Sequence, residues 1–308
     1  MTDKNAAETK GKAEEVKASG TEVAVANGDQ AIVNVAPVDM GVMDLEDFGN
    51  TGFEGSDKDS FAIPFIQILQ KMSPLVDEDD AKYITGAKAG MLFNSVTQKL
   101  YDGKKGFHII PCAYKRTYIL WGGREGDGGF KGEFTVDQVE AMRLDETKIK
   151  VIDGKMYVPS EDGTVNEKKN DYYADTRSHF VIVIDPDTQE YGAAILSLSS
   201  SQIKASKKLM TSLQQKKVQT TKGMMTPPTF ANMVKVTTVG LSNDKGTWSG
   251  VNFELDGLVT DKNHYAAAKE FYKAVVGGEV GADYSKADAA SAKGDGDVND
   301  QPSTADGF

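Results

Sequence analysis

The longest strand expected in this chain is Phe107-His-Ile-Ile-Pro-Cys-Ala-Tyr-Lys-Arg-Thr-Tyr-Ile-Leu-Trp121. β-Branched and aromatic residues dominate this stretch, and the turn-forming pair Asp102-Gly103 precedes it, so an extended backbone is favoured. Pro111 has no amide hydrogen to donate to a neighbouring strand, so we expect a bulge or a sheet edge at this position. A long strand that bends at such a point is suited to a barrel.

Further strands follow along the chain. Two are expected at 178–184 and 191–198, joined by the turn Asp185-Pro-Asp-Thr-Gln. The first is apolar at both alternating positions, so we expect it to be central in the sheet. Two more strands are expected at 230–241 and 247–255.

The segment from about residue 130 to residue 170 has the features of an insertion between strands. The glycine-rich stretch 122–132 precedes it and lacks the spacing of phosphate-binding loops, so we interpret it as a mobile loop. A short helix is expected at 136–144. Asp153-Gly154 then separates two alternating runs, which is a strong signal for a hairpin with a type I′ turn.

One helix is expected directly after Pro64. Phe65, Ile68, Leu69 and Met72 recur at the spacing of one helix face, and proline is favoured in the first turn. We expect this apolar stripe to pack on its own domain, although a helix that docks on another protein would show the same pattern.

A second helix is expected at 199–217, beginning with a capping box formed by Ser199 and Gln202. A flexible segment is expected at 220–228, and a last helix at 263–276, ended by a glycine pair. The residues of the second helix expected to face the core are Ile203, Met210 and Leu213.

The order of the long elements in residues 107–276 is strand, insertion, strand, strand, helix, strand, strand, helix. This is the order of an OB-fold, a five-stranded, partly open Greek-key barrel whose strand face and loops bind oligonucleotides or oligosaccharides. A generic mixed α+β barrel or sandwich would give a similar order. We expect a mainly β (α+β) fold: an OB-like five-stranded barrel with a helix between strands 3 and 4, an inserted hairpin and a C-terminal helix.

The net charge of -11 is distributed unevenly along the chain. Residues 1–60 carry 13 acidic and 5 basic residues, and residues 283–308 carry 6 and 2, whereas residues 61–282 carry 27 and 28. No helical or strand period is sustained in the N-terminal segment, so we expect both acidic ends to be disordered. A single domain is expected at 61–282.

Two windows of the central region contain no acidic residue, 103–124 and 191–243. A lysine-rich helix face is usually just solvated, but ordinary protein surfaces intersperse both signs of charge. Exclusion of acids from both windows therefore favours a polyanionic partner.

Several functional classes are disfavoured by the sequence. No stretch reaches the roughly 18 apolar residues of a membrane-spanning helix, and no signal peptide is evident, so we expect a soluble, cytoplasmic protein without membrane contact. Cys112 has no disulfide partner, and His108, His179 and His264 are far apart, so we expect no zinc site and no cofactor. No nucleophile elbow is present, and we expect no enzymatic activity.

Three segments resemble proteins of tailed bacteriophages, some of them described as single-stranded DNA-binding. They are Phe61-Ala-Ile-Pro-Phe-Ile-Gln-Ile-Leu-Gln-Lys-Met-Ser-Pro74, Tyr83-Ile-Thr-Gly-Ala-Lys-Ala-Gly-Met-Leu-Phe-Asn94 and Gly106-Phe-His-Ile-Ile-Pro-Cys-Ala-Tyr114. The resemblance covers about residues 60–260. It implies single-stranded DNA as partner, in the cytoplasm of the host cell.

The C-terminal residues are similar to the acidic, Phe-terminated tails of phage and bacterial single-stranded DNA-binding proteins. Here Gly307 stands where bacterial tips have proline. The resemblance implies that the tail recruits replication proteins and regulates DNA binding, whereas a tail that merely increases solubility would have the same composition. The residues expected to bind a partner are Asp306, Gly307 and Phe308.

Binding a single strand requires cations along the backbone path and aromatic faces on which bases stack. On the long strand, Tyr114, Arg116 and Tyr118 share one face, and Trp248 lies on the polar side of the last strand. Ordinary core or cross-strand packing is the alternative for each aromatic. The full set of expected nucleic-acid contacts is Tyr114, Arg116, Tyr118, Arg124, Arg177, Lys204, Lys207, Lys208, Lys216, Lys217, Lys235 and Trp248.

The resulting hypothesis is a phage-type protein that coats single-stranded DNA during replication or recombination. RNA is the alternative ligand, and a homo-oligomer is compatible with this role. The alternative function is a virion or assembly protein whose β core packs on other subunits without binding nucleic acid.

Overall fold

The computed structural model describes residues 52, 54–55, 61–126, 128–244 and 246–286. By its contacts the chain divides into two units, Met1–Glu54 and Gly55–Phe308. The architecture below is that of the second unit. The expectation of disorder for residues 1–60 and 287–308 concerns positions that lie almost entirely outside the described residues.

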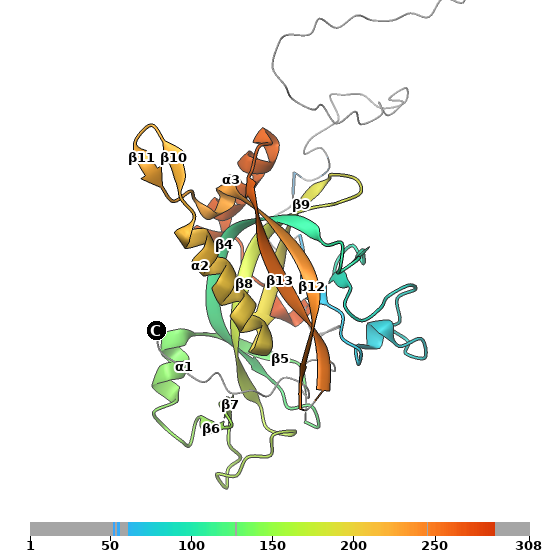
Figure 1. Ribbon diagram of the computed structural model, residues 1–308. Helices are drawn as coiled ribbons and strands as arrows, with labels where there is room; N and C mark the ends of the chain where they lie inside the picture. The colour runs from blue at the N-terminus through green and yellow to red at the C-terminus, as the bar shows by residue number, and fades with distance from the viewer. Residues whose placement is uncertain (1–51, 53, 56–60, 127, 245, 287–308) are drawn as a thin grey trace, which may run out of the picture. The chain divides into compact units, whose positions relative to one another are not determined.

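A curled antiparallel sheet forms the centre of the domain (Figure 1). Its main strands are neighbours in the order β9, β8, β4, β12, β13. The chain is mainly β, as expected, and β4 covers the full stretch predicted for it. The bounds are β4 Phe107–Trp121, β8 Tyr172–Ile184, β9 Tyr191–Ser199, β12 Asn232–Asn243 and β13 Gly246–Leu258.

The predicted bulge in β4 lies next to Pro111. The register between β4 and β8 shifts between Pro111 and Ala113, so Cys112 has no direct partner on β8. Side chains of β4 therefore change face at this point. Ile109 belongs to the cluster that packs against helix α2 (Ile203–Gln215), and beyond the bulge the even-numbered residues occupy that side.

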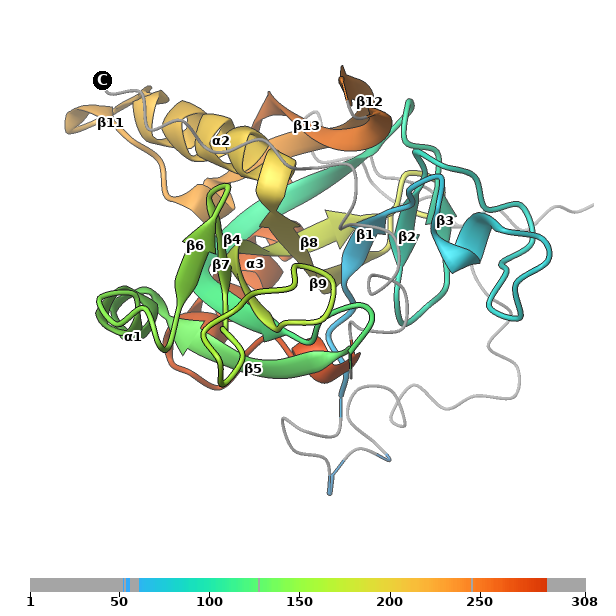
Figure 2. The same ribbon diagram turned by 90° about the horizontal axis from the view of Figure 1, so that it is seen from below.

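The expected insertion forms a small lobe at one end of the sheet (Figure 2). Its turn has positive φ at Asp153 (48°) and Gly154 (78°), which confirms the predicted type I′ hairpin. Thr135 and Gln138 form a capping box at the start of α1. The elements are β5 (Phe130–Thr135), which pairs with β4, α1 (Val136–Met142), β6 (Lys150–Ile152) and β7 (Lys155–Tyr157).

The two faces of the sheet are covered by different helices. Leu209 and Leu213 of α2 pack into a cluster with the inward residues of β4, β8, β9, β12 and β13. Ala268 and Phe271 of α3 (Lys262–Val276) cover the opposite face. Leu213 was predicted to be buried, but Ser206 and Leu209, rather than Ile203 and Met210, complete the buried side of α2.

The helix predicted after Pro64 is wrong, because this segment forms strand β1 (Ile66–Ile68) in a sheet with β2 (Leu92–Asn94) and β3 (Leu100–Tyr101). The backbone here bonds to distant strands and not within a helix, since the Pro64 carbonyl accepts a hydrogen bond from the Ile195 amide at 2.9 Å. The helical spacing was coincidental, since Met72 at the end of the pattern is 66% exposed.

Two further local predictions need correction. Ser199 makes no capping hydrogen bond, and the 3-10 turn η3 (Ser200–Gln202) precedes α2. The segment expected to be flexible at 220–228 is largely part of a hairpin, because hydrogen bonds pair β10 (Val218–Thr220) with β11 (Gly223–Met225). The remaining 3-10 turns are η2 (Pro74–Val76), η4 (Thr229–Ala231) and η5 (Tyr284–Lys286).

The packed part of the domain continues beyond residue 282. Tyr284 is 2% exposed, and its ring lies 5.4 Å from that of Phe65. Its hydroxyl bonds to Ser178 Oγ (2.5 Å) and Ser197 Oγ (3.2 Å). The C-terminal segment thus joins β8 and β9 on the sheet face covered by α3.

Candidate nucleic-acid interface

A band of polar residues crosses the α2 side of the sheet between two apolar clusters. Alternate residues of β8 on this side run Val183, Val181, His179, Arg177, Asp175 and Tyr173. Val183 and Val181 belong to the α2 cluster, and Tyr173 belongs to the cluster of the inserted lobe. We call the polar residues between them the arginine belt: Tyr114, Arg116, Asp175, Arg177 and His179.

The register of β4 and β8 brings the belt residues together. Tyr114 lies opposite His179, and Arg116 lies opposite Arg177. Directly opposite residues of antiparallel strands share a face with close side chains. Tyr114, Arg116 and Tyr118 therefore share one face, as the sequence pattern predicted.

One carboxylate holds both arginines of the belt. Arg116 donates to the two oxygens of Asp175 from Nε (3.0 Å) and Nη2 (2.8 Å), a bidentate arrangement. Arg177 donates to Asp175 at 3.3 Å and to the Tyr114 hydroxyl at 3.2 Å. Two positive charges facing one negative charge leave the cluster with a net positive charge.

The two guanidinium groups differ in accessibility. The Arg116 side chain is 36% exposed, whereas that of Arg177 is 12% exposed. The hydrogen bond with Asp175 raises the pKa of Arg116. Within the part of the chain that the structure describes, the buried Arg177 Nε has no hydrogen-bond partner. Arg116 is thus the belt cation that an incoming anion reaches most directly.

His179 connects the belt to α2. Its Nε2 lies 2.7 Å from Ser206 Oγ, and its ring lies 5.2 Å from that of Tyr114. Burial, followed by the nearby charge of Arg177, lowers the pKa of His179 to about 4. The imidazole is therefore neutral at pH 7, and it positions neighbouring groups without adding positive charge.

The predicted aromatic contacts are only partly accessible. Tyr118 is 3% exposed, packs with the inserted lobe and lies under the Arg116 guanidinium at 5.7 Å. Burial raises the pKa of Tyr118. Trp248 is half-buried, and its Nε1 donates to Ser201 Oγ at 3.1 Å. Tyr114 retains partial exposure at the edge of the belt.

The lysines of α2 and those directly after it form two groups. Lys204, Lys207 and Lys208 are exposed, and among the described residues none of them forms an ion pair. Lys216 is half-buried and donates to the Gly257 carbonyl at 2.6 Å, and burial lowers its pKa. Lys217 donates to Thr226 Oγ1 at 2.5 Å while its side chain stays exposed.

Arg124 and Lys235 lie at opposite ends of β4. Lys235 is in register with His108 near the first residue of that strand, and Arg124 follows its last residue. The structure therefore groups the predicted contacts into a belt, a basic helix and outlying positions. Asp306, Gly307 and Phe308 lie outside the described residues.

Comparison with known proteins identifies the family. A family model described as Pam3 phage gp34-like protein matches residues 33–281. The chain belongs to the Pam3 phage gp34-like family. This match confirms the phage part of the sequence resemblance. No curated protein and no solved structure matches the chain.

Asp175 and His179 are the belt residues of this family member that sequence reasoning missed. A signal was present, because the run Asp175-Thr-Arg-Ser-His179 places five consecutive polar residues in an otherwise largely apolar strand. Polar side chains on a central strand indicate a polar surface or a buried network. Their mutual contacts depend on the register with β4, which the sequence did not specify.

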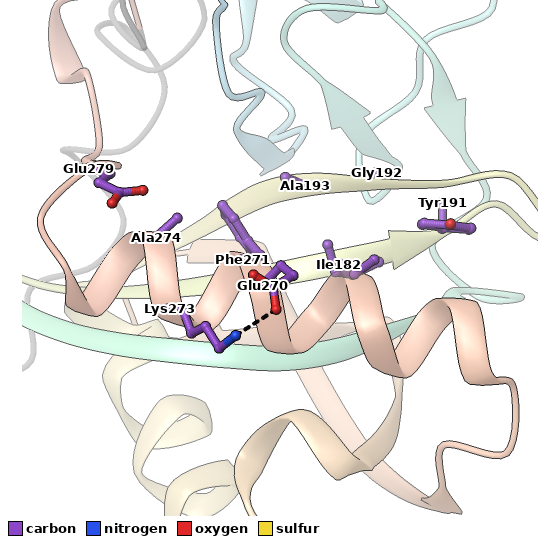
Figure 3. Close-up of a pocket in the computed structure, with 10 residues that line it drawn as sticks. Ile182, Tyr191, Gly192, Ala193, Glu270, Phe271, Lys273, Ala274 and Glu279 are labelled. Carbon is purple, nitrogen blue, oxygen red and sulfur yellow. Dashed lines mark hydrogen bonds and ion pairs between the residues drawn. The ribbon is translucent and has the colours of Figure 1, made fainter. Parts of the chain in front are cut away.

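A second concave surface lies on the opposite side of the sheet, between α3 and the β8–β9 pair (Figure 3). Its volume is about 620 Å³. Lys273 and Glu270 point along its rim and form an ion pair at 2.7 Å (Figure 3). Glu279 also lines this surface, so its charged groups sum to a net negative charge, in contrast to the belt.

The described residues lack the features of two other types of site. No helix there is long and apolar enough to cross a membrane. No group of three or more His, Cys, Asp or Glu side chains there has the arrangement of a metal site.

Proposed function

We propose that this phage protein coats single-stranded DNA during replication or recombination in the host cytoplasm. The fold supports this proposal through its strand order. The order β9, β8, β4, β12, β13, with α2 between β9 and β12 in the chain, corresponds to the connectivity of an OB-fold. We therefore propose that the curled antiparallel sheet is an OB-fold.

The observation that carries the proposal is the Arg116–Asp175–Arg177 cluster next to a helix that bears three exposed lysines. A guanidinium group matches phosphate geometry with two parallel hydrogen bonds. Arg116 already makes this bidentate contact with the Asp175 carboxylate. In the proposed complex, a phosphate replaces or shares that carboxylate.

The helix α2 extends the cationic path beyond the belt. Ser206 of α2 touches His179, so the helix begins close to the belt, and Lys207 and Lys208 follow within the next turn. Lysines on this face are proposed to contact successive phosphates, while Tyr114 and Trp248 supply aromatic surface for bases. Such binding requires no catalytic group.

The C-terminal residues 306–308 keep the role that the sequence resemblance implies. We propose that the acidic tail competes with DNA for the basic surface and recruits a replication protein through Phe308. An acidic segment tethered to a domain with a basic surface has a high effective concentration there.

The test is a titration of full-length protein with fluorescently labelled oligo-dT at several salt concentrations. Arg116→Ala and Lys207→Ala are each expected to weaken binding and to reduce the slope of log affinity against log salt by about 0.7. Arg143→Ala is a matched control, because Arg143 is an exposed arginine directly after α1 that pairs with Glu140. Absence of binding at low salt, with co-purification in phage particles, would favour a virion role instead.

A further inference from the structure

The hairpin β10–β11 leads directly away from the C-terminal end of α2 (Figure 1). We call residues 217–226 the methionine hairpin. Its strands pair Val218 with Met225, Gln219 with Met224 and Thr220 with Gly223. Gly223 has a φ of 101°, a conformation that glycine adopts without strain.

Both faces of this hairpin present an apolar side chain to solvent. Met224 is 61% exposed and Met225 is 47% exposed. Successive residues of a strand point to opposite sides, so the two methionines lie on opposite faces. A two-stranded hairpin gains little stability alone in water, and exposed methionines add none. This arrangement suits contact with a partner on both sides.

The base of the hairpin is anchored to α2. Thr226 Oγ1 donates to the Gln214 carbonyl at 3.3 Å and accepts from Lys217 Nζ at 2.5 Å. Pro227 and Pro228 follow and restrict the backbone of the exit. The methionines are therefore presented from a defined position at the end of the basic helix.

The positive charge of the hairpin favours a negatively charged partner. Lys217 at the base and Lys222 at the turn are exposed, and no acidic residue occurs anywhere in 191–243. The helix lysines continue the same charge. The partner that fits is a polyanion with apolar surfaces between its charges, as in a single strand with phosphates and unpaired bases.

We propose that the methionine hairpin binds single-stranded nucleic acid, with Met224 and Met225 packed against bases and Lys217 and Lys222 in contact with phosphates. Methionine sulfur packs favourably on aromatic rings, and methionine is among the residues that enter between bases. This inference rests on the proposed function and assigns to it a second contact region, separate from the arginine belt.

The experiment uses the full-length protein and an oligonucleotide that carries 2-aminopurine, whose fluorescence rises when the base loses its stacked neighbours. The wild type should increase this fluorescence. The double variant Met224→Ser/Met225→Ser should bind roughly five- to tenfold more weakly, with an unchanged salt slope, and should lose most of the increase. Lys217→Ala/Lys222→Ala should lower the slope by about 1.4.

Met72→Ser is the matched control, because Met72 is an exposed methionine next to the β1–β2 region. It should bind as the wild type does. If the wild type binds and both hairpin variants bind equally well, the inference is overturned while the proposed function stands. If the wild type does not bind oligonucleotides, both fail. Hairpin-dependent binding to anionic vesicles with no effect on DNA binding would also overturn the inference.

Discussion

Gln70 and Ser249 exchange two hydrogen bonds, as two paired strand residues would. The Ser249 amide donates to Gln70 Oε1 and Gln70 Nε2 donates to the Ser249 carbonyl, each at 2.9 Å. Gln202 extends this contact by accepting from the Val251 amide at 2.9 Å. Two glutamine side chains thus bond to backbone groups of Ser249 and Val251 on β13, which has β12 as its strand partner.

The glutamine contacts predict a measurable loss of stability. Gln70→Ala removes the partner of the half-buried Ser249 amide and leaves the Ser249 carbonyl with Gln202 Nε2 at 3.2 Å, so the free energy of unfolding should fall by about 1–2 kcal/mol. Gln215→Ala, at an exposed position at the end of α2, serves as control and should change stability little. Urea denaturation measures both. Equal midpoints for the two variants would contradict a structural role for Gln70.

His179 predicts a pH dependence of stability. Its pKa is about 4 in the folded protein and about 6.5 when unfolded, so the unfolded state binds more protons between these values. Stability is therefore retained above pH 6.5 and lost as pH falls towards 4. The loss between pH 7 and pH 5 should be about 2 kcal/mol from this group.

Denaturation curves at pH 7 and pH 5 test the histidine. His179→Gln should be less stable than the wild type at pH 7 but should lose less stability on acidification. His264→Gln, at a half-buried histidine on α3, should keep the wild-type decline. An identical decline in wild type and His179→Gln would show that another group is responsible.

Replacing Asp175 should change DNA binding and stability in opposite directions. Asp175→Asn removes the charge that Arg116 and Arg177 share, so DNA binding at low salt should tighten several-fold, while stability should fall because Arg177 is largely buried. Asp171→Asn, which removes the carboxylate that pairs with Lys131 on the inserted lobe, is the control. Unchanged or weaker DNA binding by Asp175→Asn would contradict competition between carboxylate and phosphate.

Tyr284 predicts that the C-terminal boundary of the folded domain lies beyond residue 282. A chain ending at residue 282 should be less stable than one ending at residue 286, because it lacks the buried ring and its bonds to Ser178 and Ser197. Tyr284→Phe should destabilise by about 1–2 kcal/mol through the two unpaired serines. Equal thermal midpoints for the two truncated chains would contradict the prediction.

Much of the fold was predictable because its strands carry strong local signals. The long run of β4, the type I′ turn at Asp153-Gly154 and the glycine pair after α3 depend on neighbouring residues alone. The segment after Pro64 was not predictable, because its conformation is set by distant partners. Ile195 is 131 positions away from Pro64, yet their backbones are hydrogen-bonded.

The candidate site was predictable in composition and not in arrangement. Alternation on β4 correctly placed Tyr114, Arg116 and Tyr118 on one side. The pattern did not show that Asp175 would bind Arg116 or that the inserted lobe would cover Tyr118. Both results follow from strand register and from packing between segments far apart in the sequence.

The long strand β4 has two different neighbours along one edge. Residues 107–109 pair with β12 and residues 117–121 pair with β5, whereas β8 follows the other edge through both regions. Among the described strands, none pairs with residues 110–116 on the first edge. The strand β4 therefore joins the inserted lobe and the β12–β13 pair in one sheet, and it carries Arg116 of the belt between them.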